Sequence, residues 1–215
     1  MSRKDDKYIP AFSYGLLTHF YDFVMRWGMR ELVFKRHLIE QARIWKGCRV
    51  LDLGCGTGTL TILIKRAHPE AEVMGVDGDP AILRIAKSKV AGAGLDITLD
   101  YGLAFELPYN EDSFDRVVSS LVFHHLTRGD KVRSLKEVYR VLRLGGELHV
   151  ADFGKPHNAA MSMVSFVMGR LEENLDNVKG LLPEMFRRAG FDHVEQTASH
   201  ATIFGTVALY KAMKP

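Results

Sequence analysis

The stretch VLDLGCGTGT at residues 50–59 decides the fold of this 215-residue chain. Mostly apolar residues lead into three glycines at alternate positions, Gly54, Gly56 and Gly58, and a helix-compatible segment, 60–67, follows directly. This pattern predicts a strand, a tight turn and the start of a helix. Glycines leave no side chains to keep a ligand away, and the unpaired N–H groups at a helix N-terminus attract anions. We therefore expect the loop to bind a ligand.

The spacing of the glycines argues against the two commonest ligands of such loops. A dinucleotide fingerprint, G-x-G-x-x-G, would place its third glycine at position 59, which is Thr59. The third glycine is Gly58 instead, and no Gly-Lys-Ser/Thr of a nucleoside triphosphate loop follows. Both nicotinamide cofactors and nucleoside triphosphates are disfavoured.

Strand-like and helix-like segments alternate along the middle of the chain, which predicts a parallel sheet with crossover helices. Ligands of such sheets bind at the carboxyl ends of the strands. A helix that ends at Gly190 precedes two last strands, which we expect to pair as an antiparallel hairpin through a turn around Gly205. The expected strands are 49–53, 72–77, 97–101, 114–120, 147–153, 194–199 and 206–210, and the expected helices are 60–67, 81–91, 130–142 and 181–189, with Gly145-Gly146 as the stop of the third.

Residues 50–58 closely resemble motif I of the class I S-adenosylmethionine (SAM) dependent methyltransferases. The resemblance is strong from 49 to 153 and weak at both ends. It implies a Rossmann-like, doubly wound α/β fold with a seven-stranded sheet that is mostly parallel and has an antiparallel C-terminal strand. We expect a single domain, with a helical and aromatic cap segment at 1–48 and the SAM-binding core at 49–215. The cofactor residues implied at the loop are Asp52, Gly54, Cys55, Gly56 and Gly58.

Asp77 ends the second expected strand, about twenty residues beyond the glycine loop. A carboxylate at this spacing can accept hydrogen bonds from both ribose hydroxyls of a nucleoside. The alternative role is to cap the helix that begins at Pro80, but Asp79 directly precedes that proline and is the better cap. We therefore expect Asp77 to bind ribose, with Gly78 and Asp79 lining the same crevice.

The expected adenine contacts depart from the family pattern. Residues 100–108, DYGLAFELP, resemble the family's Gly-Asp-Ala-x-x-Leu-Pro element, in which the aspartate reaches the adenine amino group. Leu103 stands where that aspartate would be. The resemblance then implies that adenine is held by backbone groups near Leu103 and Ala104, or by another acid such as Glu106.

Residues 112–126 resemble the family's Ser-Phe-Asp strand followed by a His-His-Leu step. Ser119, Ser120 and Leu121 would lie under the methionine arm of the cofactor. Histidine is the natural proton carrier near neutral pH, so His124 is a candidate for proton transfer, although the histidine pair could instead pack and cap the next helix. A two-histidine metal site lacks a third ligand, and we expect no metal.

Two further stretches direct attention to the methyl acceptor. Residues 148–156, LHVADFGKP, are similar to the corresponding stretch of the ubiquinone/menaquinone biosynthesis methyltransferases. Residues 137–147 resemble the stretch that enters the fifth strand in the family, where its role is architectural. Near the N-terminus, 20–22 resemble a Tyr-Asp element that covers the cofactor, which makes Tyr21 a cofactor residue. With the soft apolar segment 159–168, this favours a small, apolar or quinone-like acceptor. A small-molecule or phospholipid head-group methyltransferase, or a SAM-binding scaffold without catalysis, are the alternatives.

Composition bounds the partners and the location. The chain is 47% hydrophobic and 26% charged, with a net charge of +3 and basic residues scattered among acids, so nucleic acid is not an expected partner. The two cysteines, Cys48 and Cys55, are expected to be free thiols of a reducing compartment, with Cys55 a packing residue rather than a nucleophile. No apolar run approaches the ~20 residues that cross a bilayer. We expect a cytoplasmic enzyme with, at most, peripheral membrane contact.

Overall fold

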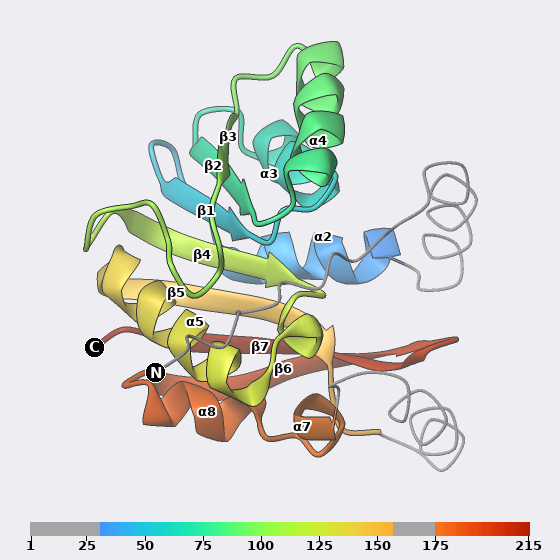
Figure 1. Ribbon diagram of the computed structural model, residues 1–215, viewed down its shortest axis with the longest axis vertical. Coiled ribbons are helices and arrows are strands. Elements are labelled where there is room, and N and C mark those ends of the chain that lie inside the picture. The colour runs from blue at the N-terminus through green and yellow to red at the C-terminus, as the bar shows by residue number, and fades with distance from the viewer. Residues whose placement is uncertain (1–30, 157–174) are drawn as a thin grey trace, which may run out of the picture.

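A seven-stranded sheet forms the centre of the computed structural model, which describes residues 31–156 and 175–215 (Figure 1). The strand order is β3-β2-β1-β4-β5-β7-β6. Only β7 runs antiparallel to its neighbours β5 and β6. The expected α/β fold with an antiparallel C-terminal strand is confirmed. The strands are β1 (Arg49–Leu53), β2 (Glu72–Asp77), β3 (Thr98–Tyr101), β4 (Phe114–Ser120), β5 (Leu142–Phe153), β6 (Asp192–Thr202) and β7 (Gly205–Met213).

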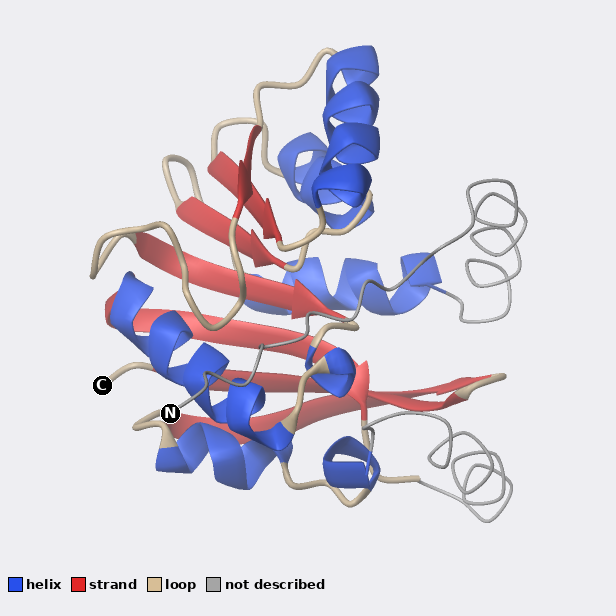
Figure 2. Cartoon of the chain, viewed as in Figure 1, coloured by secondary structure: helices blue, strands red, loops and turns tan. Residues whose placement is uncertain are grey.

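Helices cover both faces of the sheet (Figures 1 and 2). On one face, α2 and α3 bury apolar residues such as Phe34 and Ile64 against the sheet. On the other face, α5 and α8 bury Leu135 and Phe186. The doubly wound arrangement leaves the strand ends open to a ligand. The helical elements are α2 (Glu31–Ala42), α3 (Thr59–Ala67), α4 (Pro80–Ala93), the 3-10 turn η1 (Phe123–His125), α5 (Arg128–Val141), α7 (Leu175–Val178) and α8 (Leu182–Arg188).

The order of the parallel strands reverses at β1. From β1 the chain winds outward through β2 and β3, and then returns to the other side of β1 with β4. The carboxyl ends of β1 and β4 therefore lie side by side, with Leu53 opposite Ser119. This switch point is where open α/β sheets bind their ligands.

The junction between α5 and β5 differs from expectation. The helix ends at Val141, and β5 begins at Leu142, opposite Phe114. Gly145 and Gly146 do not stop the helix; they lie within β5, where the register against β4 shifts. Gly145 has a φ of +74° and pairs with Lys214 near the chain end. The helix expected over 130–142 is confirmed, but the expectation that the two glycines stop it was wrong, because a left-handed glycine also occurs at strand irregularities.

The C-terminal hairpin is confirmed, and it is longer than expected. Strands β6 and β7 are joined by Ile203 and Phe204, directly before Gly205.

Both cysteines are free thiols, as expected, and both are buried; burial raises the pKa of Cys48 to about 11. Within 31–156 and 175–215, none of the helices is long and apolar enough to span a bilayer.

Candidate functional site

The glycine loop between β1 and α3 depends on left-handed backbone at three positions. Gly54, Gly56 and Gly58 have φ values of +68°, +54° and +75°, which side chains disfavour. A Cβ on Gly54 would lie 2.4 Å from a Val122 methyl group, whereas no heavy atom lies within 4 Å of a Cβ placed on Gly56. The first glycine thus lets the segment before η1 approach, and the second leaves open space for a ligand.

Helix α3 begins at the end of this loop without a side-chain cap. Gly58 is the N-cap residue, and no side chain accepts a hydrogen bond there. The N–H groups of a first helical turn carry partial positive charge and need acceptors. A carboxylate, such as that of the amino acid end of SAM, fits this helix terminus.

Asp77 at the end of β2 is bound to the glycine loop. Its Oδ2 accepts a hydrogen bond from the Gly56 N–H at 2.8 Å, and its Oδ1 accepts one from the Asp79 N–H at 2.9 Å. Burial raises the pKa of this carboxyl, and the backbone donors oppose the rise. Since a carboxylate offers about four acceptor sites, it retains room for hydroxyl donors. The ribose contact, with half-buried Gly78 beside it, remains a prediction.

Asp79 has the capping role that the sequence assigned to it. Its Oδ1 accepts hydrogen bonds from the N–H groups of Ala81 and Ile82 at 2.8 and 3.3 Å. The cap position at the start of α4 is therefore filled, and Asp77 is not needed there.

Asp52 lies beneath the loop rather than on an open surface. Its side chain is buried and accepts a hydrogen bond from the Thr61 hydroxyl of α3 at 2.6 Å. Burial raises its pKa to about 6, against the opposing effects of the Thr61 bond and the Lys35 charge. The geometry links β1 to α3, and a direct contact between Asp52 and the cofactor remains a prediction.

We expect Asp52→Asn to stabilise the ligand-free protein at alkaline pH. A carboxyl whose folded pKa lies above its unfolded value contributes stability below pH 3.8, which is lost as the pH rises through about 6. Asparagine cannot ionise, and its oxygen can still accept from Thr61, so the variant should gain about 1–3 kcal/mol at pH 8. Urea unfolding at pH 8 and pH 4.5 measures this gain, which should fall to about a third of its size at the lower pH. Exposed Asp96→Asn is the control; a gain equal at both pH values, or shared by the control, contradicts the assignment.

Cys55 packs inside the molecule, as expected of a small apolar residue. It belongs to a buried cluster with Leu83, Ala86 and Val90, and its Sγ lies 3.1 Å from the position of a Cβ on Gly75. Burial raises the pKa of its thiol, which keeps it protonated. A thiol in this state is not a nucleophile.

The loop after β3, which carries the expected adenine contacts, is held by α5. Glu137 accepts a hydrogen bond from the Leu107 N–H at 2.9 Å, and Arg140 donates one to the Tyr109 carbonyl at 2.7 Å. Within the loop, the Leu103 carbonyl accepts a hydrogen bond from the Glu106 N–H at 2.9 Å. Among the backbone groups of Leu103, the carbonyl therefore already has a partner. The Glu106 side chain is exposed, and Leu103 and Ala104 are half-buried. Their contact with adenine remains a prediction.

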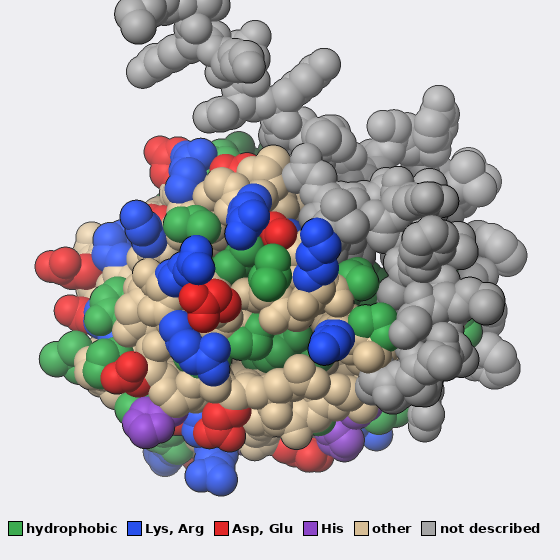
Figure 3. Space-filling view, turned by 90° about the horizontal axis from the view of Figure 1, so that it is seen from below, with side chains coloured by type: hydrophobic (Ala, Val, Ile, Leu, Met, Phe, Trp, Pro, Cys, Tyr) green, Lys and Arg blue, Asp and Glu red, His purple; other side chains and the backbone are tan. Residues whose placement is uncertain are grey.

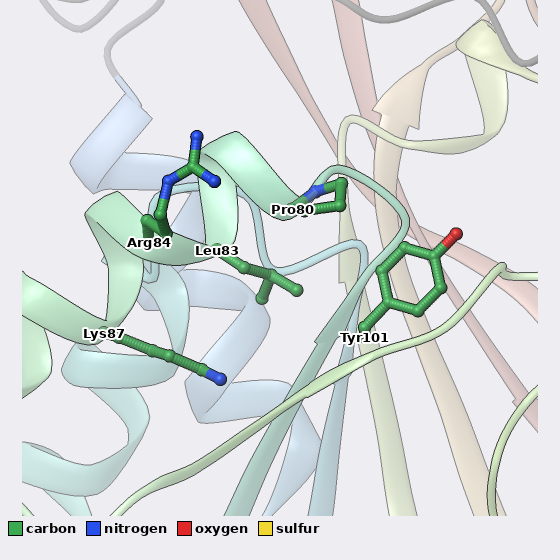
Figure 4. Close-up of a pocket in the computed structure, with 5 residues that line it drawn as sticks. All are labelled: Pro80, Leu83, Arg84, Lys87 and Tyr101. Atoms are coloured by element: carbon green, nitrogen blue, oxygen red, sulfur yellow. The ribbon is translucent and has the colours of Figure 1, made fainter.

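A shallow pocket of about 230 Å³ adjoins this loop on the side of α4 (Figure 4). Tyr101 forms one wall, and side chains of α4 form the other. Tyr101 lies opposite Asp77 in the sheet, so the pocket borders the expected ribose site. Its lining residues are Pro80, Leu83, Arg84, Lys87 and Tyr101.

The end of β4 lies against the glycine loop. The Ser119 hydroxyl donates to the Leu53 carbonyl at 3.0 Å, which joins β4 to β1. The Ser120 hydroxyl oxygen is buried and has no partner among the described residues. Leu121 follows with a φ of +61°, and a non-glycine residue in this region marks a functional or strained turn. The expected place of these residues under the methionine arm of the cofactor remains a prediction, and the sequence gave no sign of the left-handed backbone at Leu121.

His124 contacts an acid that the sequence did not assign to the site. It is 5% exposed, and its Nδ1 lies 2.9 Å from Oδ1 of Asp152, at the end of β5. The ring also packs edge-on against Phe153. The signal was available: β4 and β5 are adjacent strands, so an acid at the end of one falls beside a histidine that follows the other. These contacts bury the ring and give its Nδ1 a carboxylate partner.

Three expectations fall outside the described residues. Tyr21 and the aromatic stretch around it, 8–23, lie in 1–30, and the apolar segment 159–168 lies in 157–174.

Among the described residues, no group of three or more His, Cys, Asp or Glu side chains is placed to hold a metal ion. On the face seen in Figure 3, lysines and arginines lie interspersed with acidic and apolar side chains.

Comparison with known proteins identifies the family of this site. Residues 50–146 match a methyltransferase domain model. A demethylmenaquinone methyltransferase of Listeria monocytogenes is 31% identical over 199 residues, covering 80% of this chain and 83% of the relative. A ubiquinone/menaquinone biosynthesis C-methyltransferase of Marinomonas is 32% identical over 212 residues, covering 89% and 83%.

Solved structures agree on the fold at lower identity. The SAM-dependent methyltransferase SibL matches with a TM-score of 0.76 at 21% identity, over 94% of this chain and 59% of that one. The Haemonchus contortus phosphoethanolamine N-methyltransferase 2, crystallised with SAM, matches with a TM-score of 0.71 at 18% identity, over 91% and 56%. The chain therefore belongs to the SAM-dependent methyltransferases, as a relative of the demethylmenaquinone and ubiquinone/menaquinone methyltransferases.

Proposed function

We propose that this methyltransferase acts on a small, apolar, quinone-like acceptor. The observation that carries the proposal is the similarity to quinone methyltransferases over four-fifths of the chain. The Asp-Phe-Gly-Lys-Pro sequence at 152–156 and the apolar composition of 159–168 support the same class. A lipid-like acceptor would bring the enzyme to a membrane surface, so peripheral membrane contact is part of the proposal.

The residues of the glycine loop and the neighbouring strand ends would hold the cofactor. We propose that the uncapped start of α3 receives its carboxylate, that Asp77 receives the ribose hydroxyls, and that backbone groups of Leu103 and Ala104 face the adenine. When bound, SAM supplies a methyl group whose bond to sulfur breaks, leaving the electron pair on sulfur, as the new bond to the acceptor forms.

The chain's own part in the reaction is to align the acceptor and to take its proton. Alignment alone supplies much of the acceleration when the donor is already activated. A carbon or hydroxyl acceptor must also lose a proton, and we propose that Nε2 of His124 accepts it. In support of this role, Val122, which precedes His124 by two residues, lies against Gly54 of the glycine loop.

His124→Gln should lower kcat by about 10²- to 10⁴-fold because a general base contributes about that factor. SAM affinity should change little, since the proposed cofactor contacts lie on other residues. His125→Gln is the matched control: its ring lies 3.9 Å from that of His124, but it has no bond to Asp152. Steady-state kinetics with both variants decides the point, and equal losses in the two would remove the base assignment.

The acceptor itself is tested with a short-chain demethylmenaquinol, kept reduced, in the presence of SAM. Mass spectrometry should show a product heavier by one methylene group together with S-adenosylhomocysteine. Phosphoethanolamine is the polar comparison acceptor. Turnover of phosphoethanolamine without turnover of the quinol would replace the proposal with the head-group alternative.

A further inference from the structure

Asp152 is the hub of the hydrogen bonds around His124. The carboxylate is fully buried near the end of β5 and accepts hydrogen bonds from three segments of the chain, which are residues 122–124, β5 itself and α7. Two of the donors are side chains and three are backbone N–H groups. Oδ1 accepts from Nδ1 of His124 (2.9 Å), the N–H of Phe153 (2.7 Å) and Nδ2 of Asn177 (3.1 Å), and Oδ2 accepts from the N–H groups of Val122 (3.1 Å) and Phe123 (2.7 Å).

These donors keep Asp152 ionised. Burial alone would raise the pKa of the carboxyl, but His124 and the backbone N–H groups outweigh burial, and the pKa lies below its ordinary value. An ionised carboxylate accepts hydrogen bonds and cannot donate them. The bond between Asp152 and His124 therefore requires the proton to be on Nδ1.

We propose that Asp152 is a positioning residue, which holds the imidazole of His124 with its proton on Nδ1 so that the lone pair is on Nε2. The proposal rests on the proposed role of His124 as the base. During methyl transfer, the acceptor's proton moves to Nε2, and the negative charge of Asp152 stabilises the resulting imidazolium. Asp152 itself gains no proton, and His124 returns its proton to solvent afterwards.

Asn177 of α7 completes the arrangement from a distant part of the chain. Its side chain is buried, and its Nδ2 donates to the same oxygen as His124. Its Oδ1 is buried and has no partner among the described residues. Asn177 therefore acts only as a donor toward the Asp152 carboxylate, and this hydrogen bond fixes the orientation of the carboxylate.

The first test needs neither an acceptor nor a variant of Asp152. Nitrogen-15 NMR of histidine-labelled protein reports which ring nitrogen of each histidine carries the proton, and His124→Gln identifies the signal of His124 among the nine histidines. At pH 8 we expect a protonated Nδ1 and an unprotonated Nε2. A proton on Nε2 with a bare Nδ1 would overturn the proposal.

The second test asks whether Asp152 acts through His124. In a Ser-His-Asp triad, changing the aspartate to asparagine lowers kcat by about 10⁴-fold because the histidine takes the wrong tautomer. We expect Asp152→Asn to move the proton of His124 to Nε2 and to lower kcat by about 100-fold or more, with SAM affinity within about threefold of wild type. Combined with His124→Gln, it should lower kcat no further than His124→Gln does alone.

A purely structural Asp152 gives a different pattern. Replacing Asp152 would then leave the proton of His124 on Nδ1. The loss of kcat in the double variant would be the product of the losses in Asp152→Asn and His124→Gln. If Asp152→Asn does not fold, Asn177→Ala takes its place, because it loosens the carboxylate without leaving donors unpaired; we expect it to lower kcat by about 3- to 10-fold, again only when His124 is present. Wild-type protein that shows the expected tautomer but methylates no quinol would refute the proposed acceptor and leave the positioning role intact.

Discussion

Replacing Asp77 with alanine should weaken SAM binding by about 10- to 150-fold. Loss of a hydrogen bond to a charged group costs about 1.5–3 kcal/mol, which corresponds to this range. The variant also removes the acceptor of the Gly56 N–H, so the glycine loop loses one of its hydrogen bonds to β2 and keeps those of Gly54 and Cys55 to the Val76 carbonyl. Isothermal titration with SAM and with S-adenosylhomocysteine should show the same loss, since the ribose is common to both.

Asp79→Ala is the matched control for this prediction. It lies two residues away and caps α4, so its loss should lower the free energy of unfolding by about 1 kcal/mol. Its effect on SAM affinity should be far smaller than that of Asp77→Ala. Equal losses of affinity would mean that the whole turn matters rather than the Asp77 carboxylate, and unchanged affinity in Asp77→Ala would refute the ribose contact.

Gly54→Ala should lower the free energy of unfolding by about 2–5 kcal/mol. A left-handed alanine costs about 1–2 kcal/mol, and the collision of its Cβ with Val122 at 2.4 Å adds about 1–3 kcal/mol because a β-branched side chain at a packed position has little freedom to move. Denaturant unfolding of the ligand-free protein measures the sum.

Gly56→Ala separates the two causes. It has the same left-handed strain but meets nothing within 4 Å, so its stability loss should stop at about 1–2 kcal/mol while SAM affinity falls because the methyl group occupies the ligand space. Adding Val122→Ala to Gly54→Ala should restore the part of the free energy of unfolding that the collision with Val122 removes. Equal destabilisation by the two glycine variants would show that the contact with Val122 is unimportant.

Local patterns predicted the fold well because it follows from features a few residues apart. The glycine loop, the strand before it and Asp77 at the next strand end lie within the 29 residues 49–77, and the alternation of strands and helices predicted that the neighbouring strands run parallel. Only the role of the glycines at 145 and 146 was wrongly predicted, because a left-handed glycine such as Gly145 can end a helix or bend a strand with the same conformation; β5 therefore begins at Leu142, before the glycines.

The candidate site was only partly predictable. The cofactor contact expected of Asp52 stays a prediction; what the sequence did not indicate is its hydrogen bond to Thr61 of α3, on the face of β1 that it shares with Val50. Asp152 was missed as a partner because 28 residues separate it from His124, and only the pairing of β4 with β5 brings them together. Pairings of this kind depend on tertiary structure, which single-residue spacing does not encode.

The approach of Val122 to Gly54 also constrains how this protein can diverge. While residue 122 is β-branched, there is no space for a side chain at position 54. A homologue with alanine at 54 should therefore carry a smaller residue at 122. The two positions are 68 apart in sequence, one in the glycine loop and one just before the proposed base. Mutational libraries that vary the two loops separately would miss the paired changes, and libraries that vary positions 54 and 122 together are the way to reshape this part of the site.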